Sequence, residues 1–310
     1  MAPHWTDADI PDLTGKTALV TGANSGIGLH ESLQLARHGA QVFVAARNGD
    51  KGRAAIEMLR EHVPADRVEL VPLDLADLDS VRRLAGELAG RLEHLDLLVN
   101  NAGVMAVPSR QTTTQGFELQ FGTNHLGHFA LTGLLLPLLL AATDSRVVTV
   151  SSVMHKVGRI DLDDLQSERA YGPQRAYGAA KLANAVFTLE LDRRLRAVGA
   201  STLSVGAHPG FSHTNLQNTG TGFVARMSAL VTPVFAQSAA RGALPVLRAA
   251  VDPLAHGGDY YGPHGVAEMW GYPVKVPYTR TAHDAELGKA LWAASVDLTS
   301  VDYAELAEAA

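Results

Sequence analysis

The sequence predicts an α/β protein with one doubly wound parallel sheet. Short apolar, β-branched stretches alternate with stretches of helical periodicity from residue 17 to residue 207, a pattern typical of βαβ units. The first apolar stretch runs into a glycine-rich turn. Glycine or polar residues also follow the later stretches, at the carboxyl edge where ligands bind in such sheets. These three observations favour a Rossmann-type domain with its ligand site at that edge.

The predicted strands are apolar runs bounded by glycine or polar residues. In the second, QVFVAA, only the first residue is polar, and the run lies between Gly39 and Asn48, which indicates a strand buried on both faces. Strands are expected at residues 17–20, 41–46, 68–73, 95–100, 146–151 and 201–207. Helices with the right-handed crossovers of parallel sheets are expected between them, at residues 27–37, 52–61, 80–90, 117–140 and 177–197.

The two ends of the chain lie outside this alternation. Residues 1–14 are expected to form an extended lead-in, and residues 15–310 one domain in which residues 215–310 are a substrate-side appendage. Residues 216–237 carry one charge and have helical spacing. This fits a lid over an apolar substrate, a core or subunit-interface helix, or, less well for want of a basic face, a membrane-surface helix. Residues 259–277 predict a folded loop region, and residues 284–295 a final helix.

Composition excludes several classes of function. The chain has 310 residues and a net charge of -6, so a nucleic-acid binder that acts through a basic surface is not expected. It contains no cysteine, which excludes disulfides, thiolate metal sites and cysteine nucleophiles. The N-terminus lacks the apolar core of a secretory signal, and the apolar run at 129–142 is shorter than the ~18 residues of a membrane span. We expect a soluble, cytoplasmic protein in which that run is a buried or subunit-facing helix.

The glycine-rich turn after the first strand is a candidate phosphate site. A strand that enters a helix through glycines places backbone N–H groups and the positive end of a helix dipole at one point. A Cβ would block the turn or the approach of a phosphate. The spacing departs from G-x-G-x-x-G, so a plain structural turn remains the alternative. The expected contacts are Gly22, Asn24, Ser25, Gly26, Ile27 and Gly28.

The end of the second strand decides between the two nicotinamide coenzymes. An acidic residue usually binds the free ribose 2′-hydroxyl of NAD there, but residues 45–48 read AARN. The guanidinium of Arg47 suits a 2′-phosphate, so NADP(H) is predicted, with hydrogen bonds added by Asn48 and Ser25. A solvated surface arginine is the alternative. After the third strand, Asp74 is expected either to accept a hydrogen bond from the adenine amino group or to cap the next helix.

Tyr177 and Lys181 lie four residues apart on a predicted helix and therefore share one face. A free phenol has a pKa of ~10, and a nearby ammonium or cationic nicotinamide favours the phenolate. We expect Lys181 and a bound cationic nicotinamide together to lower the pKa of Tyr177, which then exchanges a proton with a carbonyl or alcohol oxygen, while Ser152 donates a hydrogen bond to that oxygen. The alternative for the Tyr-x-x-x-Lys pair is a solvated helix face. A proline disfavours a shared helix face for Tyr171 and Arg175.

Together these residues resemble the short-chain dehydrogenase/reductase family. The resemblance covers residues 13–215. The segments GKTALVTGANSGIG, NHLGHF and HPG are similar to those of the retinol-dehydrogenase-like and protochlorophyllide-reductase-like branch of the family. Membrane retinol dehydrogenases carry an N-terminal hydrophobic anchor that is not seen here, which weakens the expectation of membrane attachment and of a retinoid substrate. The family's motifs occur in order as Thr21-Gly22-x-x-x-Gly26-Ile27-Gly28, Asn100-Asn101-Ala102-Gly103, Asn124, Ser152, Tyr177-x-x-x-Lys181 and Pro209-Gly210 with Thr214.

The resemblance implies a role for each motif residue. Tyr177 would be the catalytic acid and base, and Ser152 would orient the carbonyl. Lys181 would hold the nicotinamide ribose, and Asn124 would hold a water between Lys181 and solvent, although its chemistry alone suggests a structural amide. Thr214 would contact the nicotinamide carboxamide. The other expected cofactor contacts are Asp74, Leu75, Asn101, Ala102, Gly103, Tyr177, Pro209 and Gly210.

Three histidines lie close to these motifs. His125 and His128 follow Asn124 without a third ligand in view, so we expect them to pack or to support the site residues from behind, and no metal. His155 is expected either to line the substrate pocket or to be a buried polar group with satisfied hydrogen bonds.

The sequence predicts an NADP(H)-dependent oxidoreductase that moves hydride between nicotinamide and the carbonyl or alcohol carbon of a small apolar substrate, working as a ketone or aldehyde reductase. A homodimer through residues 129–140 and 177–197 is an open option. The competing interpretations are a non-catalytic NADP(H)-binding sensor, a double-bond reductase, and a sugar-nucleotide epimerase, which would need a larger C-terminal domain.

Overall fold

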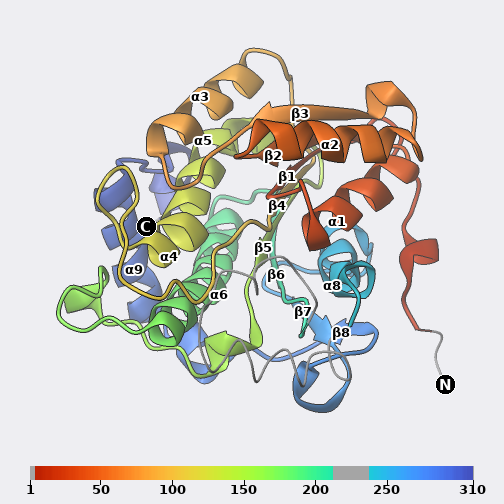
Figure 1. Cartoon of the computed structure of the whole chain (residues 1–310). Coiled ribbons are helices and arrows are strands. Elements are labelled where there is room, and N and C mark those ends of the chain that lie inside the picture. Colours follow the sequence, from red (N-terminus) through yellow and green to blue (C-terminus); the bar gives the residue numbers. More distant parts are fainter. Residues whose placement is uncertain (1–3, 212–236, 310) are drawn as a thin grey trace.

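A computed structural model describes residues 4–211 and 237–309. Its middle layer is an eight-stranded sheet with the order β3-β2-β1-β4-β5-β6-β7-β8 (Figure 1). Neighbouring strands are parallel except for β7 and β8, which are antiparallel. The strands are β1 (Thr17–Thr21), β2 (Gln41–Ala46), β3 (Val68–Pro72), β4 (Leu97–Asn100), β5 (Arg146–Val150), β6 (Leu203–Ala207), β7 (Tyr260–Pro263) and β8 (Pro273–Lys275).

Helices cover both faces of this sheet (Figure 1). Successive residues of β1 point to opposite faces, so Ala18 and Val20 belong to one hydrophobic core and Leu19 to the other. The first core also contains residues of α1 (Gly26–Arg37), α2 (Gly49–Arg60) and α8 (Ala239–Val251). The second contains residues of α3 (Leu78–Ala89), α5 (Gly127–Ala141), α6 (Pro173–Ala197) and α9 (Ala285–Thr299).

The six predicted strands and their connecting helices are confirmed, and the doubly wound parallel sheet with them. The predicted helix at 117–140 is present in three parts, because α4 (Leu119–Phe121) passes through a π-helical turn (Gly122–Leu126) into α5. A π turn is often found at a functional site. The helix predicted from residue 177 begins earlier, with Pro173 in its first turn, where a missing N–H costs nothing.

The C-terminal part differs from the prediction. Residues 259–277 were expected to be loops, but they contain β7 and β8, which extend the sheet beyond β6. Tyr260 and Tyr261 of β7 are almost fully buried, which anchors this short strand. Helix α8 was not predicted, because Pro245 lies inside it and the sequence around it is rich in alanine. The final helix is confirmed and extends to Thr299.

The apolar helix from Leu119 to Ala141 is long and apolar enough to cross a membrane, but 78% of its most apolar window is buried inside the molecule. The prediction of a buried helix at 129–142 is therefore confirmed. Helix α9 packs against both α5 and α6, and the ring of Trp292 lies 5.1 Å from that of Phe129 and 6.0 Å from that of Phe187. Contacts within the chain thus explain the apolar character of these two helices, and the homodimer stays a prediction.

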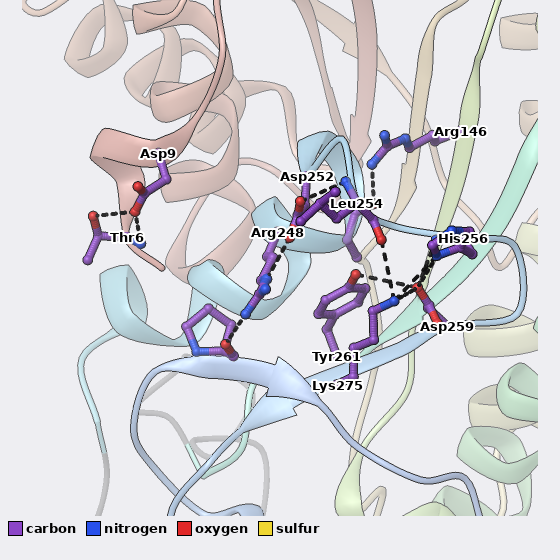
Figure 2. Close-up of polar contacts among 12 residues, drawn as sticks. Thr6, Asp9, Arg146, Arg248, Asp252, Leu254, His256, Asp259, Tyr261 and Lys275 are labelled. Atoms are coloured by element: carbon purple, nitrogen blue, oxygen red, sulfur yellow. Dashed lines mark hydrogen bonds and ion pairs between the residues drawn. The ribbon is translucent and has the colours of Figure 1, made fainter. Parts of the chain in front are cut away.

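A hydrogen bond joins α8 to β8, and an ion pair joins β8 to the residue before β7, as Figure 2 shows. The guanidinium of Arg248 lies 2.8 Å from the Asp252 carboxylate and donates to the carbonyl of Pro273 over 2.6 Å. The Lys275 ammonium of β8 lies 2.6 Å from the carboxylate of Asp259, directly before β7. The Lys275–Asp259 pair therefore lies at the amino end of β7 and ties β8 to it.

Candidate active site

A cavity of about 1100 Å³ opens at the carboxyl ends of the strands. Residues that follow β1, β2, β3, β4, β5 and β6 all line it. It includes the point between β1 and β4 where the strand order reverses, which is where doubly wound sheets bind ligands. The predicted location of the site is therefore matched by a cavity of the size that small-molecule sites have.

The glycine turn forms one wall of the cavity. Gly22 and Gly26 have φ values of 67° and 60°, a region that other residues rarely adopt. A Cβ on Gly22 would lie 2.9 Å from Cα of Ala102, and one on Gly28 would lie 2.5 Å from Nδ2 of Asn101. The turn is thus pressed against the segment after β4. Ser25 precedes α1, and its side chain makes no capping hydrogen bond to the helix.

A hydrogen-bond network built on Thr21 joins this turn to the segment after β4. Its hydroxyl oxygen accepts hydrogen bonds from the backbone N–H groups of Asn101 and Ala102, both over 2.9 Å. The Asn101 amide donates to the carbonyl of Thr21 over 2.7 Å. Nε2 of His128 lies 2.9 Å from the Thr21 hydroxyl, and Nδ1 lies 2.9 Å from the Asn124 carbonyl oxygen. The buried His128 is therefore a structural link, as predicted.

The second and third strands place their predicted residues differently. Arg47 lines the cavity, and so do Asp74 and Leu75. Asn48 is not among the lining residues, because its side chain accepts a hydrogen bond from the backbone of Lys51 and caps α2. Asp74 does not cap α3, whose cap is Asp77. The carboxylate of Asp74 instead accepts a hydrogen bond from the backbone N–H of Ala76 over 2.9 Å.

Tyr177 and Ser152 lie together on the other wall of the cavity, opposite the glycine turn. Ser152 is the second residue after β5, and its segment lies so close to α6 that a Cβ on Gly158 would be 2.2 Å from the carbonyl oxygen of Gly178. Glycines at 158 and 178 therefore permit the approach. The side chains of Ser152 and Tyr177 share a hydrogen bond, which lowers the pKa of the phenol.

Burial dominates the electrostatics of this wall. It raises the pKa of Tyr177 to about 12, against the opposing hydrogen bond from Ser152. It lowers the pKa of Lys181 to about 8. The ammonium of Lys181 donates to the carbonyl of Val150 over 2.9 Å and lies 5.8 Å from the centre of the Tyr177 ring. In the chain by itself, desolvation of the phenolate thus outweighs a charge at that distance. The expected lowering of the Tyr177 pKa by Lys181 together with a bound cationic nicotinamide stays a prediction.

Asn124 lies in the π-helical turn and clamps the backbone of Val104. Its Oδ1 accepts the N–H of Val104 over 2.8 Å, and its Nδ2 donates to the carbonyl over 2.9 Å. A Cβ on Gly103 would lie 3.2 Å from Asn124 Oδ1 and 3.7 Å from Lys181 Nζ. The three residues thus converge, and the predicted water contact of Asn124 stays a prediction.

The other two histidines are buried hydrogen-bonding groups. Nε2 of His125 lies 3.0 Å from the hydroxyl of Ser295. Nδ1 of His155 lies 2.6 Å from the carbonyl oxygen of Ser152, and its Nε2 accepts the N–H of Thr279 over 3.3 Å. His155 does not line the cavity; it ties the Ser152 segment to the C-terminal part of the chain.

Sequence reasoning missed the apolar end of the cavity. Val104, Met105 and Ala106 follow the predicted Asn101–Gly103 motif directly, so their position was a usable signal. Met269 comes from the segment after the unpredicted β7, and no local pattern marks it. Phe211 follows Gly210, which lines the cavity as predicted, as does Pro209. The missed lining residues are Leu73, Val104, Met105, Ala106, Pro108, Thr123, Val150, Ser151, Val153, Met154, Gly172, Pro173, Gln174, Arg175, Phe211 and Met269.

Thr214 and residues 216–236 of the predicted lid lie outside the described residues. Tyr171 is confirmed to lie before α6. Its hydroxyl donates to the carbonyl of Val107 over 2.6 Å, so it is a structural tyrosine.

Comparison with known proteins agrees with this geometry. A family model described as short chain dehydrogenase matches residues 16–221. Retinol dehydrogenase 13 of Homo sapiens is 40% identical over 297 residues, which cover 94% of this chain and 86% of that protein. Polyprenol dehydrogenase of Mus musculus is 42% identical over 298 residues, which cover 94% and 85% of the two chains.

Solved structures share the fold. An uncharacterized protein from Mycobacterium paratuberculosis superimposes with a TM-score of 0.81 at 44% identity, covering 97% of this chain and 99% of that one. A structure described as the Pseudomonas aeruginosa RhlG/NADP active-site complex has a TM-score of 0.63 at 25% identity and covers 84% and 96% of the two chains. The fold of this chain is thus shared by solved structures of other proteins.

Proposed function

Because the chain belongs to the short-chain dehydrogenase family of nicotinamide-dependent oxidoreductases, we propose that it is an NADP(H)-dependent reductase of ketones or aldehydes. The observation that carries the proposal is the meeting of Tyr177, Ser152 and Lys181 on one wall of the cavity whose other wall is the glycine turn. A non-catalytic nucleotide sensor would not need these three side chains together.

The cavity suits a dinucleotide along its length. The glycine turn leaves no room for a Cβ at residues 22 and 28, so its backbone lies open to a pyrophosphate at the start of α1. The predicted adenosine-side residues Asp74, Leu75 and Asn101 line the same wall. When bound, the nicotinamide supplies or accepts the hydride. Lys181 and the segment Pro209–Gly210 border the part of the cavity next to Tyr177.

The chain's own residues would handle the proton and the carbonyl. With its pKa raised to about 12, the Tyr177 hydroxyl keeps its proton at neutral pH and donates it to the carbonyl oxygen as that oxygen gains charge. Ser152 donates a second hydrogen bond to the same oxygen. The Lys181 ammonium adds positive charge behind the phenol, which favours the phenolate left after proton transfer.

Arg47 supports the choice of NADP(H). It is the cationic residue at the end of β2 and lines the cavity, where a guanidinium can bind a 2′-phosphate with charge-assisted hydrogen bonds. The NADP in the RhlG complex is a property of that protein and agrees with this choice.

The substrate end favours an apolar carbonyl compound. Met105, Met154, Phe211 and Met269 line it, and flexible thioethers adapt to substrates of varied shape. The names retinol dehydrogenase and polyprenol dehydrogenase describe relatives that act on apolar alcohols, which agrees with such a substrate. Ketones and aldehydes with apolar chains are therefore the first class to test.

The decisive experiment is a panel of ketones, aldehydes, alcohols and conjugated enones, followed by NADPH absorbance with product analysis. Carbonyl reduction with NADPH supports the proposal. Reduction only of the carbon–carbon double bond of enones would establish the double-bond reductase instead, and binding of NADPH without turnover of any compound would establish the sensor. Cell fractionation and sedimentation test the accompanying proposals of a cytoplasmic location and a homodimer.

A further inference from the structure

The segment after β7 carries an acidic side chain that contacts two segments of the candidate active site, the one after β5 and the one after β6. Glu268 ends a short 3-10 turn (Val266–Glu268), and the next residue, Met269, lines the cavity. One carboxylate oxygen lies 2.5 Å from the ammonium of Lys156, and the other lies 2.9 Å from Nε2 of His208. Lys156 belongs to the turn that begins at Ser152, and His208 precedes Pro209 directly. A single carboxylate thus joins the segments after β5 and β6.

The hydrogen bonds fix the protonation state of this contact. His208 is fully buried, and its Nδ1 accepts the backbone N–H of Gly210 over 3.2 Å. Nε2 of a neutral ring must then carry the proton and donate to Glu268. Burial favours the neutral ring by lowering the pKa of His208. Burial also acts to raise the pKa of Glu268, but the hydrogen bonds from His208 and Lys156 outweigh it and hold that pKa at about 2. The contact therefore pairs one carboxylate with one ammonium and one N–H donor.

Backbone contacts repeat the same connection. The N–H of Phe211 donates to the carbonyl of Met269 over 2.8 Å. A Cβ on Gly210, whose φ is 65°, would lie 2.5 Å from that carbonyl oxygen. Ala267 and Glu268 adopt φ values of 51° and 58°, a strained conformation for residues with side chains. Strain of this kind persists where the surroundings demand it, and here it turns Glu268 toward Lys156 and His208.

We propose that Glu268 is a positioning residue that holds the Ser152 segment and the Pro209–Gly210 segment at the separation that hydride transfer requires. The inference rests on the proposed function, in which Ser152 orients the carbonyl and Pro209–Gly210 border the nicotinamide. Glu268 itself does not line the cavity. Its effect reaches the reaction through Lys156 on one side and His208 on the other.

The chain offers a matched control. The pair Asp259–Lys275 also joins a carboxylate to an ammonium, over 2.6 Å, with side chains 20% and 46% exposed against 15% and 37% for Glu268 and Lys156. It lies at the amino end of β7 instead of beyond its carboxyl end (Figure 2). Loss of this control pair should lower the free energy of unfolding by a comparable amount. It should not move the Ser152 segment or the Pro209–Gly210 segment.

The first measurement is the rate of a single turnover, with enzyme and NADPH in excess over a carbonyl compound that the wild type reduces. Glu268→Gln keeps the size and one hydrogen bond but loses the ion pair, and Lys156→Met loses the same pair from the other side. Both should slow the turnover by about tenfold or more, since misplacement by about 1 Å costs up to about a hundredfold. The Kd for NADPH should change by less than about threefold. Lys156→Arg should restore the rate, and Asp259→Asn and Lys275→Met should leave it unchanged.

The second measurement does not depend on turnover. The chain has no cysteine, so the exposed residues Val157 and Val266 can be replaced by cysteine as a pair and spin-labelled. Dipolar broadening of the electron paramagnetic resonance spectrum should weaken in the Glu268→Gln background and persist with Asp259→Asn. An unchanged spectrum, or a rate loss equal to that of Asp259→Asn, would overturn the inference. Absence of any carbonyl reduction by the wild type would refute the proposed function, while the spectra would still decide whether Glu268 holds its own turn against the Ser152 segment.

Discussion

The ammonium of Lys181 lies 5.8 Å from the centre of the Tyr177 ring, and it donates its hydrogen bond to the carbonyl of Val150, not to the phenol. Both side chains are buried, and burial moves their pKa values toward the neutral forms, to about 12 for Tyr177 and about 8 for Lys181. The pair is thus arranged to keep the phenol protonated until a charge develops on the substrate.

Tyr177→Phe should abolish most of the turnover while leaving NADPH binding intact. The substitution removes only the hydroxyl, and loss of general acid catalysis costs about 10²- to 10⁴-fold in rate. Steady-state rates and fluorescence titration with NADPH measure the two quantities. Tyr171→Phe is the matched control. This variant should keep most of its activity, because the Tyr171 hydroxyl donates to the backbone carbonyl of Val107 and takes no part in the proposed proton transfer. Equal losses in both variants would remove Tyr177 from the mechanism.

Arg47→Asp should shift the coenzyme preference from NADPH toward NADH. Hydrogen bonds to charged groups contribute about 1.5–3 kcal/mol, so the ratio of kcat/KM values for the two coenzymes should change by about ten- to a hundredfold. Arg60→Asp, an exposed change at the end of α2 away from the cavity, should leave the ratio as it is. An unchanged ratio in Arg47→Asp would mean that Arg47 is a solvated surface residue.

Local patterns were sufficient for the six strands up to Ala207, because each is a short, mostly apolar or β-branched stretch between helical stretches. They were insufficient for β7, a four-residue strand that contains Gly262 and Pro263. That strand is held by tertiary burial of Tyr260 and Tyr261, which no short window of sequence reveals. The same reason hid Met269, whose place in the cavity depends on where β7 ends.

The positions of the site residues were predictable from the sequence, but the direction of the pKa shift of Tyr177 was not. Motif spacing located Tyr177, Lys181 and Ser152 on one wall, because helix geometry and strand ends fix their directions. The sign of the pKa shift of Tyr177 was not predictable from spacing. It depends on how many apolar atoms surround the phenol, and burial of Tyr177 is a property of the whole fold.

Trp292→Ala should destabilise the protein by about 3–5 kcal/mol, the usual cost of removing a buried tryptophan. The Trp292 ring contacts those of Phe129 and Phe187, and the guanidinium of Arg194 lies 4.3 Å from its centre. Denaturant unfolding measures the change. Trp270→Ala, at a side chain that is 38% exposed, should cost clearly less. Sedimentation of Trp292→Ala should also show self-association, because α9 covers the apolar faces of α5 and α6.

A carboxyl group in α1 gives the protein an unusual pH dependence of stability. Glu31 is fully buried one turn from Ile27 and Leu35, and neither carboxylate oxygen has a hydrogen-bond partner among the described residues. Burial raises the pKa of Glu31 from its ordinary 4.5 to about 8. Between these two values the folded state holds a proton that the unfolded state has released. The free energy of unfolding contributed by Glu31 therefore falls as the pH rises from about 4.5 to about 8.

The buried histidines act in the opposite direction at lower pH. Burial lowers the pKa of His125 and His155 to about 4, so below their ordinary 6.5 the unfolded state binds more protons and stability rises with pH. Glu31 should consequently dominate between about pH 6.5 and pH 7.5, below the lowered pKa of Lys181, about 8, near which the unfolded state binds more protons than the folded state at that group. Over that window the Tm of the wild type should fall as the pH rises, and Glu31→Gln should remove most of the slope. The exposed change Glu57→Gln should preserve it, and a slope that survives in Glu31→Gln would assign the dependence to another group.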